Sequence, residues 1–316
     1  MQKVTFVRIL NILLVFGLVS IILMFIYHNF IKPHVNCKPT ITTAIGYAAS
    51  KICSGALIFE ENFDKLDKHK WRPQVTLSTH GANGDFQLYV AGDKNSFATD
   101  GHLNIKPTLT AQKIGYDKVE NGSIHLNDCT DANKSNCERK TDGNSIINPI
   151  RSARLHTKSS FAFKYGRVEV IAKMPIGDWL WPAIWLLPLQ WKYGKGRRSG
   201  EIDLVQSRGN VDYIDSNGNQ IGVKRVTSTL HFGPKSNMDG WPSSTYSRKN
   251  PDGFNHVFHR YECLWNDKGI KFFVDNIEIG YTAAGNGGFW EIGQFHGDNI
   301  WANGTKMAPF DEEVNI

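Results

Sequence analysis

Two carboxylic acids and an amide, Glu201, Asp203 and Gln206, follow one another at the spacing of a short β-strand. Alternate side chains of a strand share a face, so the two acids point the same way. A β-bulge, one extra residue at Leu204 or Val205, would bring Gln206 to that face as well. Two carboxyl groups about 5 Å apart can cleave a glycosidic bond with retention of configuration, one as nucleophile and one as acid/base. An amide cannot carry that proton, so this pattern indicates either a disabled site or an ordinary solvated strand face.

Further motifs surround this strand on both sides. They are, in chain order, Phe59–Phe63, Ile147–Ile150, Ser152–Leu155, Tyr165–Val170, Trp181–Pro188 and Ser228–Pro234. Together with the acidic strand they resemble glycoside hydrolase family 16, in its branch of β-1,3-glucanases and β-1,3-glucan-binding proteins. The resemblance extends over about residues 56–316 and keeps the motifs in the order of the family.

The resemblance implies a role for each polar residue of the strand. Glu201 matches the nucleophile that attacks the anomeric carbon, and Asp203 matches the carboxylate that orients it. Gln206 stands where the family has the acid/base glutamate, which protonates the leaving oxygen and later deprotonates water. Acid/base catalysis is typically worth about 10²–10⁴-fold in rate, so we expect glucan hydrolysis to be slow or absent. The alternative is a polar network that persists on the floor of a cleft without a catalytic role.

Tryptophans form the second group of candidate site residues, because the apolar faces of sugar rings stack on exposed indoles. The candidates are Trp179, Trp181, Trp185, Trp290 and Trp301. Burial in the core is the alternative for each of them, and for Trp185 in particular. Trp181, which precedes Pro182, is the preferred platform.

The resemblance places two more residues beside the predicted cleft. His231, in the run Leu230–Phe232, is expected near Glu201, and the alternative is a structural histidine. Arg154 matches a family position near the cleft, and the alternative is a packed salt-bridge partner.

The remaining pattern predicts an all-β fold. Val168 and Val170 alternate with polar neighbours, and residues 256–280 read as strands separated by Asn/Asp/Gly turns. No stretch outside the N-terminus has a helical period, and residues 110–148 read as a long polar insertion. Many short strands imply a sandwich, and the resemblance sharpens this to a concanavalin-like jelly roll of two antiparallel sheets.

The N-terminus predicts a membrane anchor. Residues 9–27 are apolar apart from Asn11 and Ser20, and they are long enough to cross a bilayer. We expect residues 1–8 to be cytosolic, 9–27 to be a transmembrane helix, 28–55 to be a stalk and 56–316 to be the glycosidase-like domain. This arrangement makes a single-pass type II protein with an extracellular or lumenal domain. A cleaved signal peptide, and hence a secreted protein, is the alternative.

The five cysteines suit an exported chain. Cys129 and Cys137 bracket a polar loop, as a short disulfide does, and Cys37 with Cys53 is a second candidate pair. Cys263 lies in a strand-like run and is expected to be a buried thiol.

Charge and composition exclude some classes of partner. The net charge of +6 is spread along the chain, and the dense cluster of Lys192, Lys195, Arg197 and Arg198 is short for a nucleic-acid site. That cluster reads as a solvated loop, with glycan contact near the cleft mouth as the alternative. No spacing predicts a metal site and the chemistry requires no cofactor, although a structural Ca²⁺ is compatible with the family.

Three hypotheses follow for the function. The first is a pattern-recognition protein of the kind found in invertebrate immunity, which binds β-1,3-glucan through a glycosidase fold that lacks its acid. The second is a retaining endo-β-1,3-glucanase or transglycosylase with residual activity. The third is a truncated, inactive product, because the family continues with further strands beyond the position of Asp311 whereas this chain stops at Ile316.

Overall fold

The computed structural model describes residues 20, 37–47, 51–77 and 86–316. The predicted membrane span, 9–27, lies outside these residues apart from Ser20. Within the described part, no helix is both long enough and apolar enough to span a membrane. The chain divides into two units, of which the smaller consists of residues 1–40 and 51–56. In this unit the predicted disulfide Cys37–Cys53 is present, and Pro39 forms a β-bridge with Cys53.

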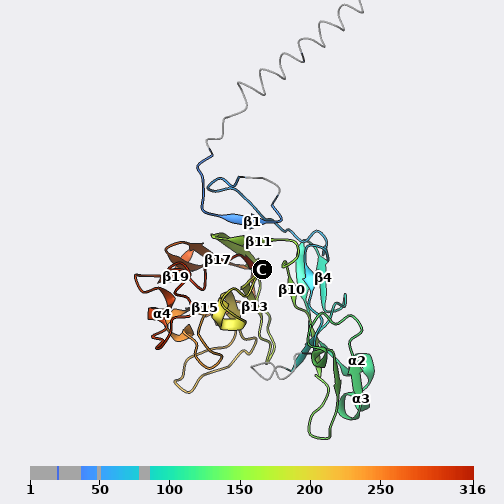
Figure 1. The fold of residues 1–316 in the computed structure, drawn as a ribbon. Coiled ribbons are helices and arrows are strands. Elements are labelled where there is room, and N and C mark those ends of the chain that lie inside the picture. Colours follow the sequence, from blue (N-terminus) through green and yellow to red (C-terminus); the bar gives the residue numbers. More distant parts are fainter. Residues whose placement is uncertain (1–19, 21–36, 48–50, 78–85) are drawn as a thin grey trace, which may run out of the picture. The chain divides into compact units, whose positions relative to one another are not determined.

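The larger unit is built on a seven-stranded antiparallel sheet (Figure 1). Its strands in spatial order are β1 (Thr43–Ile45), β11 (Ala162–Lys164), β20 (Val314–Asn315), β13 (Ala183–Pro188), β14 (Glu201–Ser207), β15 (Arg225–His231) and β16 (Thr245–Lys249). β1 lies in the segment expected to be a stalk, yet it pairs with β11 over its whole length. β20 occupies an inner position between β11 and β13.

A second antiparallel sheet of four strands packs on the first. Its order is β12 (Gly166–Ala172), β17 (His259–Asn266), β18 (Gly269–Val274) and β19 (Ile277–Ala283). These strands confirm the pattern predicted at Val168 and Val170 and the turn-separated strands of residues 256–280. Inward-facing side chains of both sheets, among them Ile202, Leu230 and Trp265, form one buried cluster. The all-β sandwich predicted from sequence is therefore confirmed.

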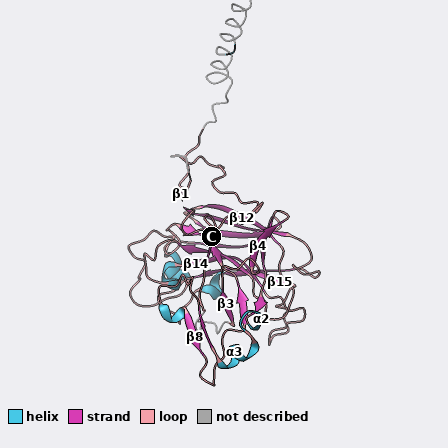
Figure 2. Ribbon diagram, turned by 90° about the vertical axis from the view of Figure 1, so that its right-hand side faces the viewer, coloured by secondary structure: helices cyan, strands magenta, loops and turns pink. Residues whose placement is uncertain are grey.

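Smaller elements surround the sandwich (Figure 2). The remaining strands are β2 (Arg72–Pro73), β3 (Gln87–Tyr89), β4 (Ser96–Thr99), β5 (His102–Ile105), β6 (Thr108–Leu109), β7 (Ser123–His125), β8 (Glu138–Lys140), β9 (Ile150–Ser152) and β10 (Leu155–His156). The helices are α2 (Ala111–Ile114), α3 (Tyr116–Asn121) and α4 (Gly288–Ile292), with 3-10 turns η2 (Lys134–Asn136), η3 (Gly196–Ser199) and η4 (Trp241–Ser244). The helices have no sequence period because each spans less than two turns.

The predicted insertion, residues 110–148, is an ordered lobe rather than a loop. It contains α2, α3 and the hairpin of β7 and β8, and the predicted disulfide Cys129–Cys137 is present within it. Leu126 from this lobe joins a second buried cluster with Val75 and Leu88. Cys263 is a buried free thiol, as expected.

Candidate functional site

A β-bulge in β14 brings the three polar residues to one face. Trp185 on β13 is opposite Asp203, whereas Ile184 is opposite Val205, so Leu204 is the extra residue. The pairing of β14 with β15 shifts in the same place, and Ser228 Oγ donates to the Leu204 carbonyl at 2.7 Å. The bulge predicted from sequence is confirmed. We call this side of the sheet, which carries Glu201, Asp203, Gln206 and His231 and lies opposite the core, the acid face.

Both ends of the Gln206 amide are occupied. An indole N–H is a donor only, so the 3.0 Å contact from Trp181 Nε1 identifies the amide oxygen of Gln206 as its acceptor. The amide nitrogen then donates to Asp203 Oδ2 in a short contact. A carboxylate at position 206 would instead direct negative charge at Asp203. The amide is thus complementary to an ionised Asp203.

His231 connects Asp203 to a second carboxylate. In the register of β14 and β15 it is opposite Glu201, and its Nε2 lies 3.3 Å from Asp203 Oδ2. Its Nδ1 lies 2.8 Å from Asp239 Oδ2, and this oxygen is also 2.5 Å from Arg197 Nε. Burial lowers the pKa of His231, but the hydrogen bonds to the two aspartates outweigh it and raise the pKa to about 10. His231 is therefore a cation at neutral pH that contacts both aspartates, and it lies near Glu201 as predicted.

Glu201 is the carboxyl group whose protonation responds to pH near neutrality. Burial, together with the negative charge of Asp203, raises the pKa of Glu201 to about 7, against the opposing effects of His231 and Arg154. Asp203 itself is buried, and its Oδ1 has no hydrogen-bond partner in the described part of the chain. A proton held on Glu201 would have this oxygen as an acceptor on the same strand face.

Arg154 lies beside the acids and stacks on an aromatic ring. Its guanidinium carbon is 4.8 Å from the ring centre of Trp185, the residue opposite Asp203. Burial lowers the pKa of Arg154, and the nearby charges of Tyr89 and Glu201 oppose that shift. Tyr89, which accepts a 3.0 Å hydrogen bond from Gln87 Nε2, was not among the predicted site residues. Arg154 and Trp185 therefore both belong to the acid face.

The loop before β13 carries two exposed indoles. Trp179 is 78% exposed and Trp181 is 50% exposed. Trp181 lies under the guanidinium of Arg208 at 5.6 Å, and Trp179 packs edge-on against Tyr213 at 6.4 Å. Trp181 is bonded to Gln206, whereas Trp179 is further out. Both side chains keep exposed surface, and their contact with a glycan stays a prediction.

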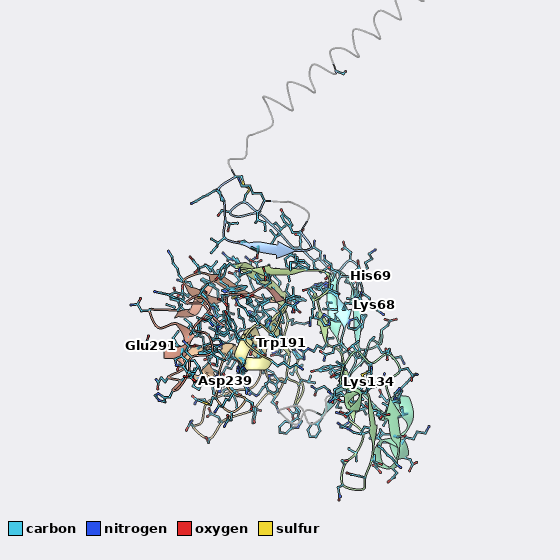
Figure 3. All side chains as sticks on the ribbon, in the orientation of Figure 1. Lys68, His69, Lys134, Trp191, Asp239 and Glu291 are labelled. Atoms are coloured by element: carbon cyan, nitrogen blue, oxygen red, sulfur yellow. A yellow bond between two sulfur atoms is a disulfide. The ribbon has the colours of Figure 1, made fainter. Side chains whose placement is uncertain are left out.

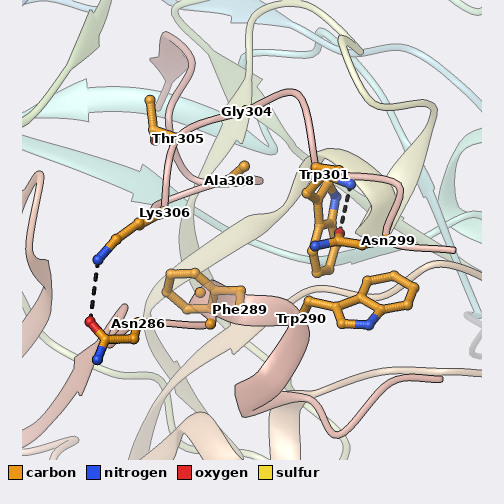
Figure 4. Close-up of a pocket in the computed structure, with 12 residues that line it drawn as sticks. Asn286, Phe289, Trp290, Asn299, Trp301, Gly304, Thr305, Lys306 and Ala308 are labelled. Carbon is orange, nitrogen blue, oxygen red and sulfur yellow. Dashed lines mark hydrogen bonds between the residues drawn. The ribbon is translucent and has the colours of Figure 1, made fainter. Parts of the chain in front are cut away.

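Trp290 and Trp301 lie elsewhere. They pack edge-on at 5.8 Å in an aromatic cluster, and Trp301 Nε1 donates to the Arg198 carbonyl. With only 3% of its surface exposed, Trp301 presents no ring face to a sugar, so its prediction as a binding residue is wrong. Both line a separate pocket whose other walls are Phe289, Lys306 and their neighbours, with no residue from β14 or β15 (Figure 4). Trp301 supports the segment before Glu201 from the core side.

The basic cluster before β14 is mainly structural. Lys192 pairs with Glu312, Arg197 pairs with Asp239 (labelled in Figure 3), and Arg198 donates to the Tyr193 carbonyl. These contacts fasten the turn that leads into Glu201. In the part of the chain that the structure describes, no three His, Cys, Asp or Glu residues are grouped so as to hold a metal ion.

Residues 122–287 match the model of glycosyl hydrolases family 16. A β-1,3-glucan-binding protein of Penaeus monodon is 42% identical over 82% of this chain and 72% of its own length. The β-1,3-glucan-binding protein 1 of Galleria mellonella is 34% identical over 84% of this chain, which spans only 53% of that relative. The laminarinase of Rhodothermus marinus has the same fold, with a TM-score of 0.55 and 22% identity over 82% of each chain.

Proposed function

The chain belongs to glycosyl hydrolase family 16, and on that premise we propose that it recognises β-1,3-glucan across the acid face while hydrolysing it slowly or not at all. The observation that carries the proposal is the Gln206 amide, which is bonded to Trp181 at one end and to Asp203 at the other. A retaining mechanism needs a group there that gives and takes a proton, and an amide does neither.

The proposed binding mode uses the aromatic and polar groups that surround Gln206. Trp181 and Trp185 offer indole surfaces to the sugar rings, and Arg154 offers hydrogen-bond donors to their hydroxyl groups. His231 holds Asp203 in place between them. The names of the relatives from Penaeus monodon and Galleria mellonella, both β-1,3-glucan-binding proteins, support this ligand class. By the same analogy, the chain would act in the recognition of foreign glycans.

The test measures binding and turnover on the same preparation. The purified protein is titrated with laminarin to measure its affinity, and the release of reducing sugar from laminarin is followed in parallel. We expect measurable affinity with hydrolysis near background, and Trp181→Ala should weaken binding. Rapid hydrolysis by the unmodified chain would refute the proposal and favour a retaining endo-β-1,3-glucanase, for which the Glu201–Asp203 pair is still present. Absence of laminarin binding would refute both.

We also propose that the domain works outside the cytosol, held by residues 9–27 or secreted. The disulfides Cys37–Cys53 and Cys129–Cys137 support this location, because reducing compartments do not preserve such bonds. Expression of the full chain followed by protease treatment of intact cells tests it. The domain should be degraded or found in the medium, and its protection inside the cell would contradict the proposal.

A further inference from the structure

Trp241 is an exposed tryptophan beside the acid face that no motif singles out. It begins η4, the turn that leads into β16, and it is 46% exposed. Its backbone N–H donates to Asp239 Oδ1 at 3.1 Å, while the other oxygen of that carboxylate binds His231 and Arg197. Trp241 is therefore fixed to the same hydrogen-bonded chain as Asp203. It stands at the end of that chain opposite Trp181.

The strand directions place Trp181 and Trp241 at opposite corners of the acid face. β13, β14, β15 and β16 are successive antiparallel neighbours, so β13 and β16 run in opposite directions. Trp181 precedes the start of β13, where Ala183 is opposite Gln206. Trp241 precedes the start of β16, where Thr245 lies in one row with Asp203. A line between these two corners of the sheet crosses the rows that carry the acids and His231.

The separation of the two corners sets the length of a ligand that reaches both. Across the strands, the two corners are three strand spacings apart, or about 14 Å. Along the strands, the row of Gln206 and the row of Glu201 are about 13 Å apart. The diagonal is therefore about 20 Å, which only a chain of several linked sugar units can span. Between the corners, the hydroxyl groups of Thr229 and Thr245 lie 3.2 Å apart and add polar contacts to the acid face.

We infer that Trp241 is a second stacking platform, which makes this site select longer glucan chains over short ones. The inference rests on the proposed glucan binding and adds the length of ligand that is recognised. A short oligosaccharide would contact Trp181 and the acids without reaching Trp241. A longer one would stack on both indoles.

The test is a titration of β-1,3-linked oligosaccharides from two to six units against the unmodified chain, Trp181→Ala and Trp241→Ala. Tyr281→Ala is the matched control, because Tyr281 is an exposed aromatic residue on β19 of the other sheet. We expect Trp181→Ala to weaken binding at every length. Trp241→Ala should weaken only the longer oligosaccharides, by about 3- to 10-fold, and Trp241→Phe should largely restore them.

The outcomes separate the inference from the function on which it rests. Unchanged affinity of Trp241→Ala at all lengths, with Trp181→Ala impaired, overturns the second platform and leaves glucan binding in place. Equal loss at every length also overturns it, because Trp241 would then act through Asp239 and His231. If the unmodified chain binds none of the oligosaccharides, both proposals fail. Circular dichroism and thermal midpoints, compared with those of Tyr281→Ala, exclude loss of the fold as the cause.

Discussion

Gln206→Glu should convert a binding site into a working glycosidase. Trp181 can still donate to one oxygen of the new side chain, but the other replaces the amide nitrogen that now bonds Asp203. Two carboxylates in such contact cannot both ionise easily. At a separation of about 4 Å and an effective dielectric constant of about 20 they repel by about 4 kcal/mol, or about 3 pKa units. The cationic His231 next to Asp203 offsets part of this repulsion, because its positive charge attracts both carboxylates.

The new glutamate should therefore hold its proton near neutral pH and serve as the general acid. We expect laminarin hydrolysis to rise by about 10²–10⁴-fold over the unmodified chain, as measured by reducing-sugar release. The acidic limb of the rate profile should reflect Glu201, whose pKa of about 7 must be exceeded before it can attack as a carboxylate. The double variant Gln206→Glu with Glu201→Gln is the control and should lose the gain. If Gln206→Glu binds laminarin normally but hydrolyses it no faster, the reasoning about the missing acid is wrong.

Three further predictions concern His231, Trp181 and the lobe of residues 110–148. His231 has a folded-state pKa of about 10, so its stabilising contribution is complete below about pH 6.5 and is lost as the pH rises through 10. Urea unfolding at a series of pH values should show this loss of unfolding free energy. His231→Ala should lower the unfolding free energy by about 3 kcal/mol and abolish its dependence on pH in this range. Trp181→Phe keeps an aromatic face but leaves the Gln206 oxygen without its donor, so it should cost about 1 kcal/mol of stability while retaining most laminarin affinity. Replacing Cys129 and Cys137 with serine should cost about 2.5 kcal/mol, seen as a lower thermal midpoint, with affinity unchanged because the lobe contributes no residue to the acid face.

Local patterns in the sequence predicted the parts of the site that depend on local geometry. Side chains alternate along a strand, so Gln206 could share a face with the two acids only if a bulge came between them. The structure has that bulge at Leu204. The short interval between Cys129 and Cys137 predicted their disulfide. In both cases the residues are close along the chain, so few alternative geometries were available.

Contacts between distant segments could not be read in the same way. Asp239 reaches His231 because a turn after β15 folds back, and no motif marks that carboxylate. β1 consists of three residues without a hydrophobic period, and its pairing with β11 determines its conformation. Trp181 faces solvent whereas Trp301 is buried in the core, although both are tryptophans. The exposure of each side chain depends on packing partners from distant parts of the chain.

The hydrogen bonds around Gln206 explain why an amide can be favoured at this position once catalysis is not required. A catalytic acid next to Asp203 has to gain and lose its proton during the reaction, so its contact with Asp203 would change with pH. With Gln206, the amide, Trp181, Asp203, His231 and Asp239 form one chain of donors and acceptors. Such a chain holds Trp181 and His231 in fixed positions before a ligand arrives, which lowers the ordering cost of binding. Under the proposed function, an amide at position 206 therefore withholds acid/base catalysis and also makes the acid face a more rigid surface for recognition.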